Sequence, residues 1–185
     1  MSDWRELERE ILLETPYLRV QREVVATPTR PEGVEWTVTR RKQAAVVAPR
    51  TLDGRYLLVK QERVPIRAAI WEFPAGQVDG EVTPESILEA AHRELGEETG
   101  HRCAGAMLAL GSFYSSAGFT DERGHLFLAT DVVPRAEGHA HDDGEAILEC
   151  RAFTVDELRE MIARNEICDA NTLSLFARLL ATRNL

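Results

Sequence analysis

The chain is poor in cysteine, in net positive charge and in long apolar runs, and each shortage excludes a class of protein. Its three cysteines are widely spaced, with no Cys-x-x-Cys pair, so we expect reduced, mostly buried thiols rather than disulfides or a zinc site. A net charge of −9 disfavours a nucleic-acid-binding protein. No apolar run approaches the roughly 20 residues of a membrane span, and the charged start MSDWRELERE is unlike a signal peptide. We therefore expect a soluble, cytoplasmic protein without nucleic-acid or membrane partners.

The chain does contain enough apolar sequence for a folded core. Its 185 residues are 44% hydrophobic and 29% charged, which is typical of a globular protein. Alternating or apolar segments predict strands at 17–27, 34–41, 42–49, 55–63, 69–77, 106–114, 125–133 and 146–154. Helices are predicted at 3–13, 84–99, 155–164 and about 170–182. Because helices and strands do not alternate regularly, the pattern favours a mixed α+β sandwich over a doubly wound sheet.

Three glutamates near the end of the second predicted helix pose the main functional question. Glu94, Glu97 and Glu98 are spaced i, i+3 and i+4, which places them on one helical face where like charges repel. A solvated acidic face, relieved by Arg93, is the ordinary interpretation. Against it, the opposite face carries the apolar residues Ile87, Leu88, Ala91 and Leu95, so the helix is expected to pack on a core and hold its acidic face in place. A Pro/Gly loop at 74–76 lies just upstream, and carboxylates with a carbonyl are ligands that Mg²⁺ takes.

The segment RELGEETG, residues 93–100, resembles the motif of the Nudix hydrolases. The upstream part of that motif departs from the family pattern. Counting back from Arg93, Glu85 falls on the expected glutamate but Asp79 stands where glycine belongs; starting from Gly76 leaves three extra residues. We interpret this as a three-residue insertion, which leaves open the roles of Glu81 and Glu85.

The surrounding sequence resembles the ADP-ribose and nucleotide-sugar pyrophosphatase branch of that family. The resemblance covers about residues 10–182 and includes AAVVAP, KQER and EFPAG. It implies a Nudix-type α/β/α sandwich with a mixed sheet at 43–185. Residues 1–42 would form an N-terminal helix and a small antiparallel sheet, which in that branch builds a swapped homodimer and contributes to the partner's site. Ser116-Ala117-Gly118 stands where ADP-ribose members often have Ser-Pro-Gly, a departure that bears on the substrate.

The resemblance also implies roles for individual residues. The metal ligands would be the Ala75 carbonyl and the carboxylates of Glu94, Glu97 and Glu98, with Glu94 counted among the catalytic residues as well. Substrate contacts would come from Trp36 stacked on the base, Arg41 near the base, Arg63 near the diphosphate and Glu72 at the distal ribose. On the residues alone, sheet packing is the more common role of such a tryptophan, and only the resemblance makes base stacking an equal alternative for Trp36.

The catalytic base is expected on the acidic, glycine-bearing loop 137–149. Glu145 matches the family's base by position, and Asp142 and Asp143 compete with it. His139 and His141 invite a zinc interpretation, which the absence of paired cysteines or a third nearby histidine disfavours.

These residues together imply Mg²⁺-dependent hydrolysis, with Mn²⁺ as a substitute metal, of the diphosphate bond of ADP-ribose or a related nucleotide sugar. The products would be a nucleoside monophosphate and a sugar phosphate. Another nucleoside diphosphate derivative, such as a UDP- or GDP-sugar or a dinucleotide, is the first alternative. A non-catalytic nucleotide-sensing module is the second alternative. It is disfavoured because the motif glutamates Glu94, Glu97 and Glu98 are all present. RNA decapping is disfavoured by the acidic charge.

Overall fold

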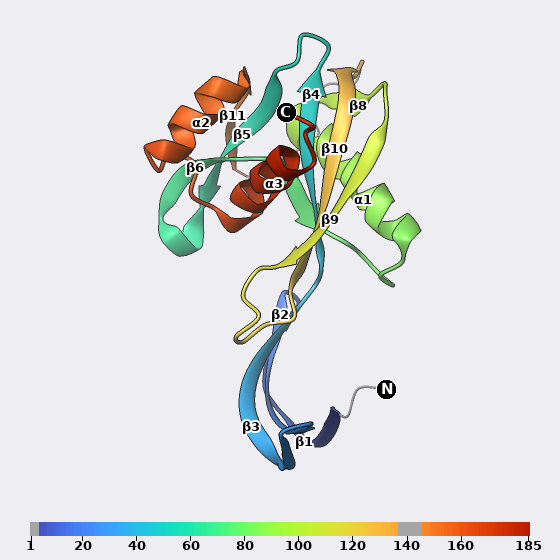
Figure 1. Ribbon diagram of the computed structural model, residues 1–185, viewed down its shortest axis with the longest axis vertical. Coiled ribbons are helices and arrows are strands. Elements are labelled where there is room, and N and C mark those ends of the chain that lie inside the picture. Colours follow the sequence, from blue (N-terminus) through green and yellow to red (C-terminus); the bar gives the residue numbers. More distant parts are fainter. Residues whose placement is uncertain (1–3, 137–145) are drawn as a thin grey trace. The chain divides into compact units, whose positions relative to one another are not determined.

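The computed structural model describes residues 4–136 and 146–185, and it divides into two compact units (Figure 1). The first unit combines Met1–Gln43 with Tyr114–Arg123, and the second combines Ala44–Phe113 with Gly124–Leu185. A segment from the middle of the chain thus belongs to the N-terminal unit. The expected division of roles between 1–42 and 43–185 stays a prediction.

The first unit is built on a three-stranded antiparallel sheet. Its strands are β1 (Arg5–Glu14), β2 (Leu18–Thr27) and β3 (Arg30–Arg41), in the order β1-β2-β3. The small antiparallel sheet expected near the N-terminus is therefore confirmed.

The prediction of a helix at 3–13 is wrong, because Arg5–Glu14 form strand β1. Every residue of β1 is exposed, so a helical apolar stripe would have had no core to pack against. Pairing with β2 satisfies the backbone instead. Arg22 of β2 bonds Glu8 and Glu10 of β1 at 3.3 and 3.1 Å, and Glu35 of β3 at 2.9 Å. The alternating glutamates of β1 were therefore a strand signal.

The second unit contains a mixed eight-stranded sheet whose main order is β11-β5-β4-β10-β8. β6, β7 and β9 pair with β5, β4 and β10 respectively. The β4–β10 pairing is parallel, and the pairings of β5 with β4, β6 and β11 are antiparallel. The strands of this sheet are β4 (Ala44–Thr51), β5 (Tyr56–Arg63), β6 (Ala68–Glu72), β7 (Ala75–Gln77), β8 (His101–Cys103), β9 (Met107–Tyr114), β10 (Arg123–Pro134) and β11 (Ile147–Phe153).

Helices cover both faces of this sheet, so the expected α/β/α sandwich is confirmed. Along β4, Val46 and Ala48 join the core beneath α2 (Val155–Ala163) and α3 (Ala170–Ala181). Ala45 and Val47, on the other face, join the core beneath α1 (Pro84–Thr99). Figure 1 shows α1 on one side of the sheet and α2 and α3 on the other.

The ends of α1 follow the sequence closely. Thr83 caps the helix in a reciprocal capping box with Ser86, Pro84 is its first residue, and Gly100 ends it at φ 68°. Ala91 and Leu95 are fully buried as expected, whereas Leu88 is exposed, contrary to the predicted apolar face. The helix contacts the sheet near its C-terminal end, so its buried face is concentrated there.

The cysteine prediction is partly corrected. Cys168 is exposed, and Cys103 and Cys150 are only half-buried; all three are free thiols. Among the residues that the structure describes, no helix is long and apolar enough to span a membrane.

Candidate active site

The Pro/Gly loop predicted at residues 74–76 is only partly a loop, because Ala75 and Gly76 belong to strand β7, which pairs with β4. This segment, residues 74–76, and the C-terminal half of α1 form the centre of the candidate site. Glu94 and Glu98 are 2% and 1% exposed, so the interpretation of a solvated face is excluded for both. The Pro74 carbonyl accepts the Val47 amide at 2.9 Å, which ties the segment to β4. The Ala75 amide donates to Glu98 Oε2 at 3.2 Å. The sheet and the helix together therefore hold the segment against two buried carboxylates.

Gly76 permits the close approach of Glu94. A Cβ at this position would lie 1.8 Å from Glu94 Oε1, a distance that no side chain can occupy. Glycine therefore leaves room for the Glu94 carboxylate, which a larger residue would have to displace. The Glu94 carboxylate lies directly over the backbone of this segment.

Arg93 neutralises part of this negative charge. Its guanidinium lies 2.7 Å from Glu94 Oε1 and 2.9 Å from Glu97 Oε2, and it donates to the Gln77 carbonyl at 2.9 Å. Although burial works to lower the pKa of Arg93, the neighbouring Glu94 and Glu97 carboxylates outweigh it and raise the pKa. Glu97 is more accessible than Glu94 and Glu98, with 27% of its side chain exposed.

The chemistry of this donor set fits a hard divalent cation, because buried carboxylates and backbone oxygens are the ligands such ions take. Within residues 4–136 and 146–185, however, no three acidic, histidine or cysteine side chains converge as a ready-made metal cage. Glu94 and Glu97 are instead engaged by Arg93. Loading a metal would therefore exchange these ion pairs for metal contacts. The ligand role of the Ala75 carbonyl stays a prediction.

Arg63 and Glu72 form a second polar element of the same unit. The Arg63 Nε lies 2.9 and 3.1 Å from the two carboxylate oxygens of the buried Glu72, and its Nη2 also contacts Glu72. The bond to Glu72 raises the pKa of Arg63, and the negative charges of Glu98 and Asp169 add to the effect. Two residues assigned to substrate are thus paired with each other. Arg63 borders a hollow of about 350 Å³, whose other lining residues are Glu62, Val64, Arg67, Ala68 and Ala69.

The start of α3 adds residues that sequence reasoning did not assign to the site. The Asp169 carboxylate caps α3 by accepting the Thr172 amide at 2.9 Å, while the Thr172 hydroxyl accepts the Phe73 amide at 2.9 Å. Burial raises the pKa of Asp169, and the charge of Glu72 raises it further. Helix capping was visible in the sequence, but nothing in it indicated that this cap lies beside the Glu72–Phe73 segment.

Cys150 of β11 borders the same acidic region. Burial, followed by the charges of Glu98 and Glu149, raises the pKa of its thiol to about 11. A thiol with that pKa is almost wholly protonated at neutral pH, so Cys150 is a poor nucleophile.

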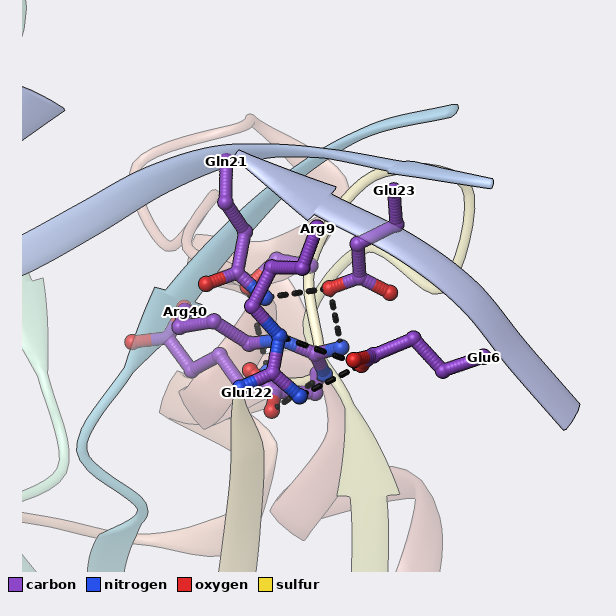
Figure 2. A network of polar contacts seen from close by, with 8 residues as sticks. Glu6, Arg9, Gln21, Glu23, Arg40 and Glu122 are labelled. Carbon is purple, nitrogen blue, oxygen red and sulfur yellow. Dashed lines mark hydrogen bonds and ion pairs between the residues drawn. The ribbon is translucent and has the colours of Figure 1, made fainter. Parts of the chain in front are cut away.

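The predicted base-binding residues lie in the first unit and share one neighbour, the loop at residues 115–122. Trp36, 51% exposed, donates its indole N–H to the Gly118 carbonyl at 2.7 Å. Arg41 Nη1 lies 2.8 Å from Glu122 Oε1. Figure 2 shows Glu122 in a polar network with Glu6, Arg9, Gln21, Glu23 and Arg40. The Ser116-Ala117-Gly118 segment is therefore brought to β3, a neighbourhood that the sequence did not reveal.

The candidate bases cannot be placed, since Asp142, Asp143 and Glu145 lie outside the described residues, as do His139 and His141. Their roles stay predictions.

Comparison with known proteins bears on the family. The family model described as NUDIX domain matches residues 39–176. The chain is 33% identical over 135 residues to an ADP-ribose pyrophosphatase of Bacillus subtilis (strain 168), covering 73% of this chain and 70% of that protein. It is also 33% identical over 136 residues to the methanol dehydrogenase activator of Bacillus methanolicus, covering 74% and 71% respectively.

A solved structure agrees with the fold. The crystal structure of an ADP compounds hydrolase superposes with a TM-score of 0.77 at 17% identity, over 98% of this chain and 94% of that one. At that identity the likeness supports the fold alone. The family match and the relative at 33% identity show that the chain belongs to the Nudix hydrolases and resembles their ADP-ribose pyrophosphatases, in agreement with the buried glutamates of residues 93–100.

Proposed function

We propose that the protein is a Mg²⁺-dependent diphosphatase that hydrolyses ADP-ribose, or a related nucleotide sugar, to a nucleoside monophosphate and a sugar phosphate. The observation that supports this most is the burial of Glu94 and Glu98 against the segment at residues 74–76. Holding two carboxylates with so little access to water is unfavourable unless cations compensate them. Arg93 supplies one positive charge to Glu94, and a divalent cation would supply more.

The metal would be held by Glu94, Glu97, Glu98 and the Ala75 carbonyl, with Mn²⁺ able to substitute for Mg²⁺. A bound divalent ion lowers the pKa of water and neutralises charge on phosphoryl oxygens. Arg63 lies beside a hollow and suits the negative diphosphate. The carboxylate of Glu72 suits the hydroxyls of the distal ribose. Glu145 is proposed as the base.

Recognition of the nucleobase is assigned to Trp36 and Arg41. An aromatic ring that is half exposed and fixed through its N–H can stack on a base. In keeping with the branch it resembles, the protein is proposed to act as a homodimer through its N-terminal sheet. Exposed apolar side chains along β1, including Leu7, Ile11 and Leu13, support this proposal.

The experiment that tests the proposed function is a substrate panel. The purified protein is incubated with Mg²⁺ and, separately, with ADP-ribose, UDP-glucose, GDP-mannose, diadenosine polyphosphates or NADH, and the products are resolved by chromatography. We expect ADP-ribose to be preferred and to yield AMP. Preference for another nucleotide sugar would keep the reaction and change the substrate. Tight nucleotide binding without turnover of any compound would support the sensing module instead.

A further inference from the structure

Arg40 on β3 connects a buried carboxylate to the loop at residues 115–122. Its Nη2 donates to Glu23 Oε1 at 2.5 Å and its Nη1 donates to Asp121 Oδ2 at 2.8 Å. Glu23 is 5% exposed and also accepts a hydrogen bond from Gln21, as Figure 2 shows. One arm of Arg40 is thus anchored within the sheet, and the other holds the loop.

The electrostatics of Glu23 agree with this anchoring. Burial works to raise the pKa of Glu23, but the hydrogen bonds from Gln21 and Arg40 outweigh it and lower the pKa. Glu23 is therefore an ionised, buried acceptor that fixes the guanidinium plane of Arg40.

The loop meets β3 at several further points. The Thr39 amide donates to the Phe119 carbonyl at 2.8 Å, and Thr39 forms a parallel bridge with Thr120. Glu122 bonds Arg41 on one oxygen and the Ser115 hydroxyl, at 2.7 Å, on the other. The Gly118 carbonyl then accepts the Trp36 indole N–H. The Arg40–Asp121 pair and the Trp36–Gly118 bond therefore lie at two ends of one short, folded segment.

On the basis of the function proposed above, we propose that Arg40 is a positioning residue for nucleotide recognition. By holding Asp121, Arg40 sets the position of the Gly118 carbonyl, and that carbonyl orients the exposed ring of Trp36. Indole nitrogen only donates, so an acceptor at a fixed place restricts the ring to few orientations. A ring oriented before binding loses less freedom when a base stacks on it. Arg40 thus acts through Trp36 and the loop without touching substrate.

The test combines kinetics with a direct observation of the indole. Asp121→Ala removes only the loop side of the contact and leaves the Arg40–Glu23 pair in place, so it is the primary variant; Arg40→Ala is the second. Glu14→Ala, which removes a carboxylate paired with Arg19 elsewhere in the same sheet, is the matched control. We record the ¹⁵N–¹H resonance of the Trp36 indole for each protein, and we measure kcat and KM for ADP-ribose. The resonance is assigned as the one that is missing in Trp36→Phe.

We expect both variants to shift the indole resonance towards that of an exposed indole. KM should rise about 3- to 10-fold, the loss that follows from ordering one extra side chain on binding, while kcat stays unchanged. Arg40→Lys should keep part of the wild-type behaviour, with a smaller shift of the resonance and a smaller rise in KM than Arg40→Ala. Glu14→Ala should change neither the resonance nor KM. An unchanged resonance, or a shifted resonance with an unchanged KM, would overturn the role of Arg40.

Failure of the proposed function would be distinguishable. If the wild-type protein does not hydrolyse ADP-ribose, the proposed function is contradicted, and the equilibrium Kd for ADP-ribose measured by calorimetry replaces KM. Arg40 then keeps its role only if the variants weaken binding while they shift the resonance. Absence of binding by the wild-type protein would overturn the role of Arg40 as well.

Discussion

Gly76 of strand β7 sets how closely the backbone of residues 74–76 approaches the carboxylate of Glu94. The space that a side chain would need is already occupied by that carboxylate. Any larger residue must therefore displace either this segment or Glu94, and both carry groups proposed to hold metal. At the scale of single residues, the candidate site is defined by this contact and by the bond from the Ala75 amide to Glu98.

Gly76→Ala is expected to weaken metal binding by about 10- to 100-fold, the usual effect of disturbing the surroundings of metal ligands. Titration with Mn²⁺, followed by electron paramagnetic resonance, measures the affinity. Gly54→Ala in the β4–β5 turn is the control, because a Cβ there has nothing within 4 Å and displaces no neighbour. Its φ of +81° is unfavourable for alanine. The control should lose stability and keep its metal affinity. Equal metal affinity in Gly76→Ala and the wild-type protein would contradict the placement of Glu94.

The sequence predicted some of these residues and not others, for a physical reason. Helical spacing put Glu94 and Glu98 on one face, and the adjacent apolar positions indicated that this face was held in place. Contacts between distant segments left no such signal. The bond from Trp36 to Gly118 spans 82 positions, and Thr172 bonds Phe73 across 99. Only the folded chain shows which acceptor each donor reaches.

At the scale of elements, α3 supports the strand end that leads into the site. Thr172 is 1% exposed, and its hydroxyl accepts a hydrogen bond from the amide of Phe73, the residue directly after β6. A buried amide that loses its acceptor is left unsatisfied, which is unfavourable. The C-terminal helix therefore helps to fix the part of the chain that carries Glu72 and the segment at residues 74–76.

Thr172→Val is expected to lower the free energy of unfolding by about 1–3 kcal/mol, because valine keeps the shape and removes the acceptor. For a chain of this size each kcal/mol lowers Tm by about 2–4 °C, which calorimetry detects. Thr172→Ser keeps a hydroxyl and should recover most of the loss. If valine and serine at this position have the same Tm, the bond to Phe73 contributes little.

The wrong helix prediction at β1 came from two competing patterns in the same residues. Leu7, Ile11 and Leu12 suggested a helical stripe, while Glu6, Glu8 and Glu10 alternated with the period of a strand. Pairing with β2 decided between the two periods, since Arg22 of that strand meets Glu8 and Glu10. A short helix without a core to cover is weakly stable by itself. By contrast, α1, α2 and α3 were predictable because capping residues mark where each begins.

At the scale of the whole molecule, the partly buried carboxyl of Asp169 links stability to pH. Because burial raises the pKa of Asp169 above its ordinary value of 3.8, the folded chain holds this proton more tightly than the unfolded chain. The free energy of unfolding therefore falls as pH rises from below 3.8 through the folded-state pKa. Above that pKa the buried charge destabilises the fold, although attraction to Arg63 offsets part of the effect.

Asp169→Asn should consequently raise the free energy of unfolding at pH 7, since asparagine caps a helix as well as aspartate and carries no charge. The gain should vanish below about pH 3.8, where both proteins are neutral at this position. Urea denaturation at several pH values measures it. Asp156→Asn removes one exposed charge from the first turn of α2 and serves as the control. A gain that persists at pH 3 would contradict burial as its cause.

We propose that the buried carboxylates of Glu94 and Glu98 support metal-dependent cleavage of a diphosphate, and a comparison of Glu98→Gln with the wild-type protein tests this role. AMP release from ADP-ribose is followed by chromatography at saturating Mg²⁺ and with EDTA. Glu89→Gln, an exposed residue of the same helix, is the control. We predict release by the wild-type and Glu89→Gln proteins only with Mg²⁺, and no turnover by Glu98→Gln with its Tm retained. Near-wild-type release by a folded Glu98→Gln protein would contradict the account.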